Sequence, residues 1–137
     1  MKATLWMRSI LILRKRSDKV PHQRLLLKLK NHGISENILQ WTASWLHNRR
    51  QRVQLKGCKS EWLLSVSSGM PQGSVLGSLL FLIFINDFDK DINGTVLKFA
   101  DDSKLFVKAN CVVDRKRIQD DLDKLKQWSD LWQINAV

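Results

Sequence analysis

Two adjacent carboxylates, Asp101 and Asp102, stand between two short apolar runs, residues 96–100 and 104–107. In a strand, neighbouring side chains point to opposite faces, but at a turn both carboxylates can approach one point. Their mutual repulsion is unfavourable unless a cation lies there, and Mg²⁺ prefers such oxygen ligands. Two such ions about 3.5–4 Å apart can stabilise the attacking and leaving oxygens of a phosphoryl transfer. The pair therefore predicts a metal site, although aspartates are also ordinary residues of solvated turns.

A second feature is the loop Gly69-Met70-Pro71-Gln72-Gly73-Ser74, which precedes a strongly apolar stretch. Two glycines around a proline define a rigid turn in which a ligand can approach the backbone. If a helix starts there, its free N–H groups can bind phosphate. The alternative is a plain loop in which Ser74 caps the helix.

A third feature is a basic stretch that contains Arg49, Arg50 and Arg52. Arginines neutralise backbone phosphates, and exposed indoles can stack on bases, so this stretch is a candidate nucleic-acid-binding site. Two nearby tryptophans, Trp41 and Trp45, stand at helical spacing, which favours a place in the core instead.

The charge of the chain is distributed unevenly. The 137 residues carry a formal charge of +10, yet residues 1–59 hold 14 Lys and Arg against 2 Asp and Glu, a balance of +12. Such a half favours a polyanionic partner, or it is only a solubilising surface. The two cysteines lack metal-ligand spacing, and no apolar run approaches the ~20 residues that span a bilayer. Without a signal peptide pattern, we expect an intracellular protein, in the nucleus or cytoplasm, with no membrane partner.

Periodicity and turn residues predict the elements that position these side chains. Helices are expected from Pro21 to about residue 31, from Ser35 to about residue 46 with Ile38, Trp41, Trp45 and Leu46 on its apolar face, over 74–84, and from about residue 114 onward. Strands are expected around Val53 and Leu55 with a partner at 62–66, and in a hairpin over 95–107. Residues 1–17 lack clear periodicity, and within them residues 10–13 are only a candidate for a short buried strand. Helices mixed with hairpins indicate an α+β fold, an antiparallel sheet with helices packed on one face.

These segments together resemble the reverse transcriptases of non-LTR retrotransposons, the long interspersed elements. Residues 69–77 with Leu79-Leu80-Phe81 are similar to the family's "PQGS-VLG" motif, and Phe99-Ala100-Asp101-Asp102 is similar to its acidic signature. Residues 18–29 and 45–53 also fit the stretch between its first and second motifs. The likeness covers roughly residues 18–135, with four motifs in order.

The resemblance implies a partial polymerase palm over residues 18–137, preceded by a divergent N-terminal segment, residues 1–17. It implies that Asp101 and Asp102 are catalytic and bind Mg²⁺. It also implies a nucleotide and template site at Gly69, Pro71, Gln72 and Gly73. The implied reaction is nucleotidyl transfer from deoxynucleoside triphosphates, and the implied partners are RNA and DNA as template and primer.

One departure from the family bears on activity. The first motif carries a metal-binding aspartate six residues before the position of Asp18, and here that residue is Ile12. We therefore expect a fragment of an RNA-directed DNA polymerase that is catalytically impaired, also because the family continues beyond both ends of this chain. Two alternatives stand beside this one: a non-catalytic basic module that binds RNA or DNA, and a chain that does not fold stably by itself.

Overall fold

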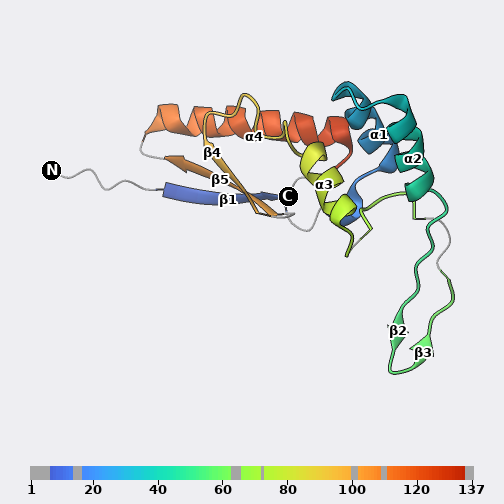
Figure 1. Cartoon of the computed structure of the whole chain (residues 1–137). Coiled ribbons are helices and arrows are strands. Elements are labelled where there is room, and N and C mark those ends of the chain that lie inside the picture. Colours follow the sequence, from blue (N-terminus) through green and yellow to red (C-terminus); the bar gives the residue numbers. More distant parts are fainter. Residues whose placement is uncertain are drawn as a thin grey trace. The chain divides into compact units, whose positions relative to one another are not determined.

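The computed structural model describes residues 7–13, 17–62, 66–71, 73–99, 102–108 and 111–134, and of residues 7–13 and 108 it describes the backbone alone. In chain order (Figure 1) the elements are β1 (Met7–Leu13), a 3-10 turn η1 (Ser17–Lys19), α1 (His22–Asn31), α2 (Glu36–Leu46), β2 (Gln54–Leu55), β3 (Cys58–Lys59), α3 (Val75–Phe84), β4 (Thr95–Phe99), β5 (Asp102–Lys108) and α4 (Val112–Trp132). They form two compact units, which we describe separately: the sheet unit, Met1–Ser17 with Ile85–Val137, and the helical unit, Asp18–Phe84.

The sheet unit contains an antiparallel sheet of three strands in the order β1-β5-β4. In β5 the side chains alternate, because Ser103, Leu105 and Val107 are buried while Lys104 is exposed. Helix α4 runs along one face of this sheet (Figure 1). The buried side chains of β5 therefore form the core with α4, whereas Leu97, Phe99 and Lys104 on the opposite face are exposed.

Helix α4 has clear signals at both ends. Its first turn contains Asp114, whose carboxylate accepts a hydrogen bond from the backbone N–H of Cys111 at 3.2 Å. Its end is marked by Gln133, which adopts the left-handed conformation with φ 57°. Along its length Leu125 and Trp132 are buried, as their spacing predicts.

The helical unit is built from α1, α2 and α3, with α1 in contact with both of the others. Its buried apolar side chains are Val20, Leu25, Leu29, Leu39, Leu46, Met70, Leu80, Phe81 and Phe84. The three predicted helices are confirmed, with one small shift. Pro21 is the N-cap residue of α1 in an extended conformation, and the helix begins at His22.

One prediction about α2 is wrong. The sequence favoured Trp41 and Trp45 for the core, but the helix buries Leu39, Thr42 and Leu46, and Trp41 is 56% exposed. The helix has two rows of apolar side chains, one with Ile38, Trp41 and Trp45 and one with Leu39 and Leu46. The second row is the buried one, and it includes Thr42. That threonine is tolerated because its hydroxyl donates a hydrogen bond to the carbonyl of Ile38 at 2.8 Å.

The hairpin between α2 and α3 also differs from expectation. Gln54 pairs with Lys59 and Leu55 with Cys58, so the pairing begins directly after a two-residue turn, earlier than predicted. It continues toward the predicted partner at 62–66, because the N–H of Ser60 donates to the carbonyl of Val53 at 2.9 Å and the N–H of Val66 donates to the carbonyl of Arg49 at 3.1 Å. The turn residues Lys56 and Gly57 both have positive φ, 46° and 85°, which is the conformation that favours tight hairpins. Residues 63–65 lie outside the described part. The side chains of Val53 and Leu55 are exposed rather than half-buried.

The α+β class is confirmed by these helices and small antiparallel sheets. The candidate strand at residues 10–13 is present as the longer β1, Met7–Leu13. The domain boundary after residue 17 stays a prediction.

Candidate active site and basic surface

The acidic pair lies at the connection between β4 and β5. The two strands pair with Phe99 opposite Asp102 and Lys98 opposite Ser103, so the connection comprises only Ala100 and Asp101. Those two residues lie outside the described part of the chain. Asp102 is half-buried and is the first residue of β5.

Strand alternation fixes the side of the sheet on which Asp102 lies. Ser103 and Leu105 face α4 and are buried, so Asp102 and Lys104 belong to the opposite face. Its cross-strand neighbour Phe99 is on that face too, and it is highly exposed. Asp102 therefore belongs to the face of the sheet opposite α4.

Strand β1 runs next to β5 at the position that bears on activity. Leu11 pairs with Lys104 and Leu13 pairs with Ser103, with a register shift between them. Ile12 is the extra residue at this irregularity, in the strand adjacent to Asp102. A bulge of this kind re-aims a side chain and is common next to active sites.

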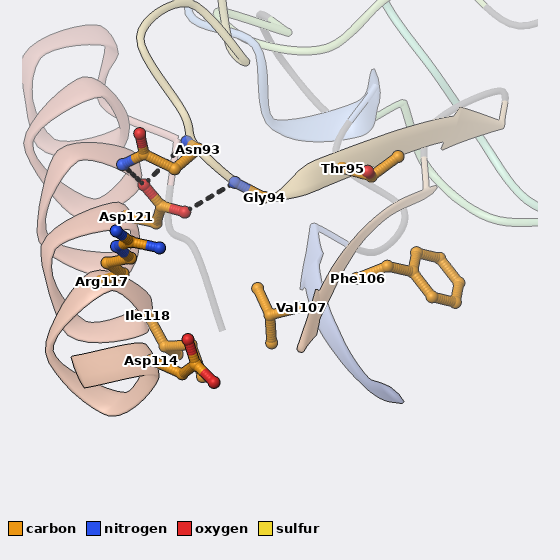
Figure 2. A pocket seen from close by; sticks show the side chains of 9 residues that line it. All are labelled: Asn93, Gly94, Thr95, Phe106, Val107, Asp114, Arg117, Ile118 and Asp121. Carbon is orange, nitrogen blue, oxygen red and sulfur yellow. Dashed lines mark hydrogen bonds between the residues drawn. The ribbon is translucent and has the colours of Figure 1, made fainter. Parts of the chain in front are cut away.

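A buried aspartate in α4 holds the start of β4. Asp121 is 1% exposed, and its carboxylate accepts hydrogen bonds from Asn93 N (3.0 Å), Asn93 Nδ2 (3.0 Å) and Gly94 N (2.9 Å). Figure 2 shows these bonds beside a cavity of about 320 Å³ between α4 and the ends of β4 and β5. Val107 points toward the helix there, and Phe106 points away from it (Figure 2). With all three bonds made, Asp121 serves to position the hairpin.

Sequence reasoning missed Asp121. A signal existed, because Asp121 stands three residues after Ile118 and four before Leu125, within the apolar stripe of α4. An acid in such a stripe is rarely buried unless donors converge on it. Those donors come from a loop 27 residues or more away in the chain, which the sequence does not reveal.

The loop between α3 and β4 is fixed to the same hairpin by a lysine. The ammonium group of Lys98 lies 2.6 Å from a carboxylate oxygen of Asp89, and it donates to the carbonyls of Ile85 at 3.2 Å and Asn86 at 3.3 Å. These carbonyls belong to the turn that follows α3, and that of Ile85 also accepts from the N–H of Phe88 at 3.2 Å. The contacts of Lys98 hold the middle of β4 and therefore restrict the hairpin that carries Asp102.

The same loop is fixed to α4 by an indole. Trp128 donates its Nε1 hydrogen to a carboxylate oxygen of Asp87 at 2.9 Å. The ring of Phe88 packs edge-on against Trp128, with centroids 4.9 Å apart.

In the helical unit, the glycine loop is fixed to the start of α1. Gly69 has φ 93°, and a Cβ atom there would lie 2.8 Å from the carbonyl oxygen of Asp18. Its N–H donates to the carbonyl of Val20 at 2.8 Å, and its own carbonyl lies 2.8 Å from Nε2 of His22. Only glycine satisfies both the backbone conformation and the close approach at this position.

The end of this loop forms the cap of α3. Ser74 donates its hydroxyl to the carbonyl of Pro71 at 2.8 Å and accepts from the N–H of Gly77 at 3.0 Å. A Cβ atom at Gly77 would lie 2.7 Å from the Pro71 oxygen. The helix-capping alternative for Ser74 is therefore confirmed. Gly73 adopts φ 77°, and Gln72 lies outside the described residues.

The predicted basic stretch is on the surface of the helical unit. Arg50 and Arg52 are exposed and Arg49 is half-buried. Arg49 donates from Nε to the carbonyl of Trp45 at 2.8 Å, and its guanidinium carbon lies 4.4 Å from the centre of the Trp45 ring. Arg52 lies over Trp62 in the same way, at 4.5 Å. The arginines therefore stand next to tryptophans.

The structure thus groups the predicted site residues in three places. Asp102 is in the sheet unit, whereas Gly69, Pro71 and Gly73 share one turn and Arg49, Arg50 and Arg52 share one extended segment of the helical unit. Among the residues described, no group of three His, Cys, Asp or Glu side chains is placed to hold a metal ion. In that same part of the chain, every helix is too short or too polar to cross a membrane.

Comparison with known proteins assigns the family. The family model described as Reverse transcriptase (RNA-dependent DNA polymerase) matches residues 4–136. The RNA-directed DNA polymerase from mobile element jockey of Drosophila funebris is 32% identical over 127 residues, which cover 86% of this chain and 14% of that protein. Its counterpart in Drosophila melanogaster is 29% identical over 126 residues, covering 85% and 14%.

A third relative, the probable RNA-directed DNA polymerase from transposon X-element of Drosophila melanogaster, is 32% identical over 128 residues, with 89% of this chain and 14% of that protein covered. The chain thus spans about 14% of the length of these curated relatives. The resemblance to retrotransposon enzymes that the motifs indicated is confirmed. This chain belongs to the reverse transcriptase (RNA-dependent DNA polymerase) family.

Proposed function

We propose that this chain is a palm region of a retrotransposon RNA-directed DNA polymerase and that its own polymerase chemistry is impaired. In this proposal Asp101 and Asp102 are the catalytic carboxylates and the ligands of Mg²⁺. The missing third ligand is the one whose place Ile12 takes. Polymerases use two divalent ions to stabilise the attacking and leaving oxygens of the transfer.

The observation that carries this proposal is the pairing of β1 with β5. Because Leu11 pairs with Lys104 and Leu13 with Ser103, residue 12 lies in the neighbouring strand, close in register to Asp102. An acid at that position would add an oxygen ligand from a separate part of the chain, whereas an isoleucine has no donor atom. In this proposal the carboxylates of one hairpin tip alone supply too few oxygen ligands for two metal ions.

For nucleotide and template contact we propose the turn that contains Gly69, Pro71, Gln72 and Gly73. Support comes from its rigidity, since Gly69 is fixed to Val20 and Ser74 to Pro71. A fixed turn presents its backbone groups with a smaller entropic cost on binding than a mobile one. The substrates of the whole enzyme would be deoxynucleoside triphosphates.

For contact with template and primer, RNA and DNA, we propose Arg49, Arg50 and Arg52. Residues 49–60 contain five Lys and Arg and no acid, which suits a phosphate backbone. The same observation favours a second candidate function, a non-catalytic module that binds RNA or DNA. For both functions we propose an intracellular location in the nucleus or cytoplasm.

Restoring the missing acid tests the impairment. We expect Ile12→Asp to tighten Mn²⁺ binding, measured by electron paramagnetic resonance, by about tenfold. The control Ile12→Asn has nearly the same size and no charge, and it should gain much less. The gain should vanish when Asp102→Asn is added to Ile12→Asp, because the two carboxylates share the ion.

Primer extension with Mg²⁺ on the purified chain is the complementary measurement. We expect incorporation at background for the unmodified chain. Robust incorporation by it that disappears on Asp101→Asn would contradict the impairment and establish an active enzyme.

A further inference from the structure

The helical unit contains two tryptophan–arginine pairs, whose arginines, Arg49 and Arg52, are three residues apart in the chain. Trp41 and Trp45 are parallel within 10°, with ring centroids 6.4 Å apart, and Arg49 continues this row beyond the end of α2. The second pair is Arg52 with Trp62. We call these five residues the Trp–Arg surface. It differs from the protein core, because Trp41 is 56% and Trp62 is 51% exposed.

A group of exposed rings indicates a binding site more strongly than a single exposed ring does, because leaving a larger apolar area in water is costly. In the Trp–Arg surface each of two rings carries a guanidinium at 4.4 or 4.5 Å. The pairing holds the arginine and the ring together, so less side-chain entropy is lost when a ligand binds. The surface therefore offers flat apolar area and fixed positive charge at one place.

The charge around this surface selects the chemistry of the ligand. The segment from Arg49 to Trp62 includes five cationic side chains and one carboxylate, Glu61, so its balance is +4. Arg49 and Arg52 are three residues apart in a non-helical segment, so their Cα atoms are at most about 10 Å apart. An anionic polymer that also carries flat rings fits this combination of exposed indoles and positive charge, and a single-stranded nucleic acid is such a polymer.

We infer that the Trp–Arg surface binds unpaired nucleotides of RNA or DNA by stacking their bases on Trp41 and Trp62. The arginines contact the phosphates on either side of the stacked bases. Paired bases are already stacked inside a duplex and cannot reach the indoles, so the surface prefers single strands. This inference rests on the proposed nucleic-acid contact by Arg49, Arg50 and Arg52, and it adds the bases as the second recognised group.

The test uses the full chain and labelled oligouridylate or oligothymidylate of about 12 nucleotides, with binding followed by fluorescence anisotropy at fixed salt. We expect Trp41→Leu and Trp62→Leu each to weaken binding about five- to tenfold, with ring-preserving Trp41→Phe and Trp62→Phe close to the unmodified chain. Leu131→Ala, a change at another exposed apolar residue, serves as the control and should have no effect. Circular dichroism verifies that each variant is folded.

An abasic oligomer with the same sugar-phosphate backbone separates stacking from charge. We expect it to bind more weakly than the base-bearing oligomer and to be insensitive to Trp41→Leu and Trp62→Leu. If the leucine variants bind the base-bearing oligomer as tightly as the unmodified chain, while Arg50→Gln weakens binding, stacking is wrong and the proposed phosphate contact stands. If the unmodified chain binds neither oligomer, both the inference and the proposed nucleic-acid contact are overturned.

A difference between oligouridylate and oligothymidylate identifies the preferred strand. Either preference supports the inference, since stacking uses the face that all bases share. A different result, in which the leucine variants lose self-association in size-exclusion chromatography but keep full affinity for the oligomers, would overturn it. That outcome would assign the indoles to contacts between copies of the chain.

Discussion

The hairpin that carries Asp102 and the surface that carries the arginines are stabilised in different ways. Around the hairpin, charged side chains contact backbone groups from distant segments, as Asp121 does at Asn93 and Gly94 and as Lys98 does at Ile85. Around the arginines, residues 50–62 are exposed throughout. This contrast suits the roles proposed for the two regions, because catalytic carboxylates must be held in place whereas a surface that binds a flexible polymer can adapt. The difference predicts where substitutions unfold the protein and where they change only binding.

The largest effect on stability is expected at Asp121. Asp121→Ala leaves the backbone N–H groups of Asn93 and Gly94 without their acceptor, so we expect a loss of about 3 kcal/mol in the free energy of unfolding. Urea denaturation followed by circular dichroism measures it. The neighbouring exposed residue gives the control, since Asp120→Ala should change stability by less than about 0.5 kcal/mol. Equal effects of the two changes, or no cooperative transition in the unmodified chain, would contradict the stabilisation of the β4–β5 hairpin by Asp121.

A somewhat smaller loss is expected in the glycine loop. In Gly69→Ala the backbone must keep a left-handed conformation and the new methyl group lies against the Asp18 carbonyl. We expect the free energy of unfolding to fall by about 2 kcal/mol. Gly57 has a similar φ of 85°, but a Cβ atom there would meet no other atom within 4 Å, so Gly57→Ala should cost only about 1 kcal/mol. Thermal or urea unfolding of both variants separates conformational strain from steric clash. A larger cost at Gly57 than at Gly69 would reverse the comparison.

Lys98→Met tests the ion pair that fixes β4. Its partly buried ammonium group contacts Asp89 and two carbonyls, so we expect a loss of about 1 kcal/mol. Lys126 forms a fully exposed pair with Asp130 in α4, and Lys126→Met should cost no more than about 0.3 kcal/mol. Chemical denaturation of the two variants at low and high salt provides the measurement. If only Lys126→Met lowered the free energy of unfolding strongly, the solvent exposure of an ion pair would not explain its contribution to stability.

The smallest effect on stability is expected on the basic surface. Arg50→Gln combined with Arg52→Gln should leave the free energy of unfolding within about 0.5 kcal/mol. The slope of log binding constant against log salt for single-stranded RNA should become shallower by about 1.4, because two phosphate contacts are lost. Arg115→Gln with Lys116→Gln, a matched exposed pair on α4, should leave the slope unchanged. An unchanged slope in the Arg50 and Arg52 variant would remove these residues from the proposed contact.

Sequence patterns predicted the helices well, because each has an apolar stripe and recognisable ends. The capping role of Ser74 and the turn at Gly69 were also readable, since glycine and serine act through local backbone geometry. The choice between the two rows of apolar side chains on α2 was not readable. Either Trp41 or Leu39 could have faced inward, and the contact with α1 decides it.

The sequence alone determined the family motifs, the acidic pair at a hairpin connection, and the concentration of positive charge in residues 1–59. These follow from residue type and short spacing. Only the tertiary structure decided that β1 pairs with β5, that Asp121 holds Asn93 and Gly94, and that Trp41 faces outward. The reason is that register and burial depend on contacts between segments far apart in the chain, which no local periodicity encodes.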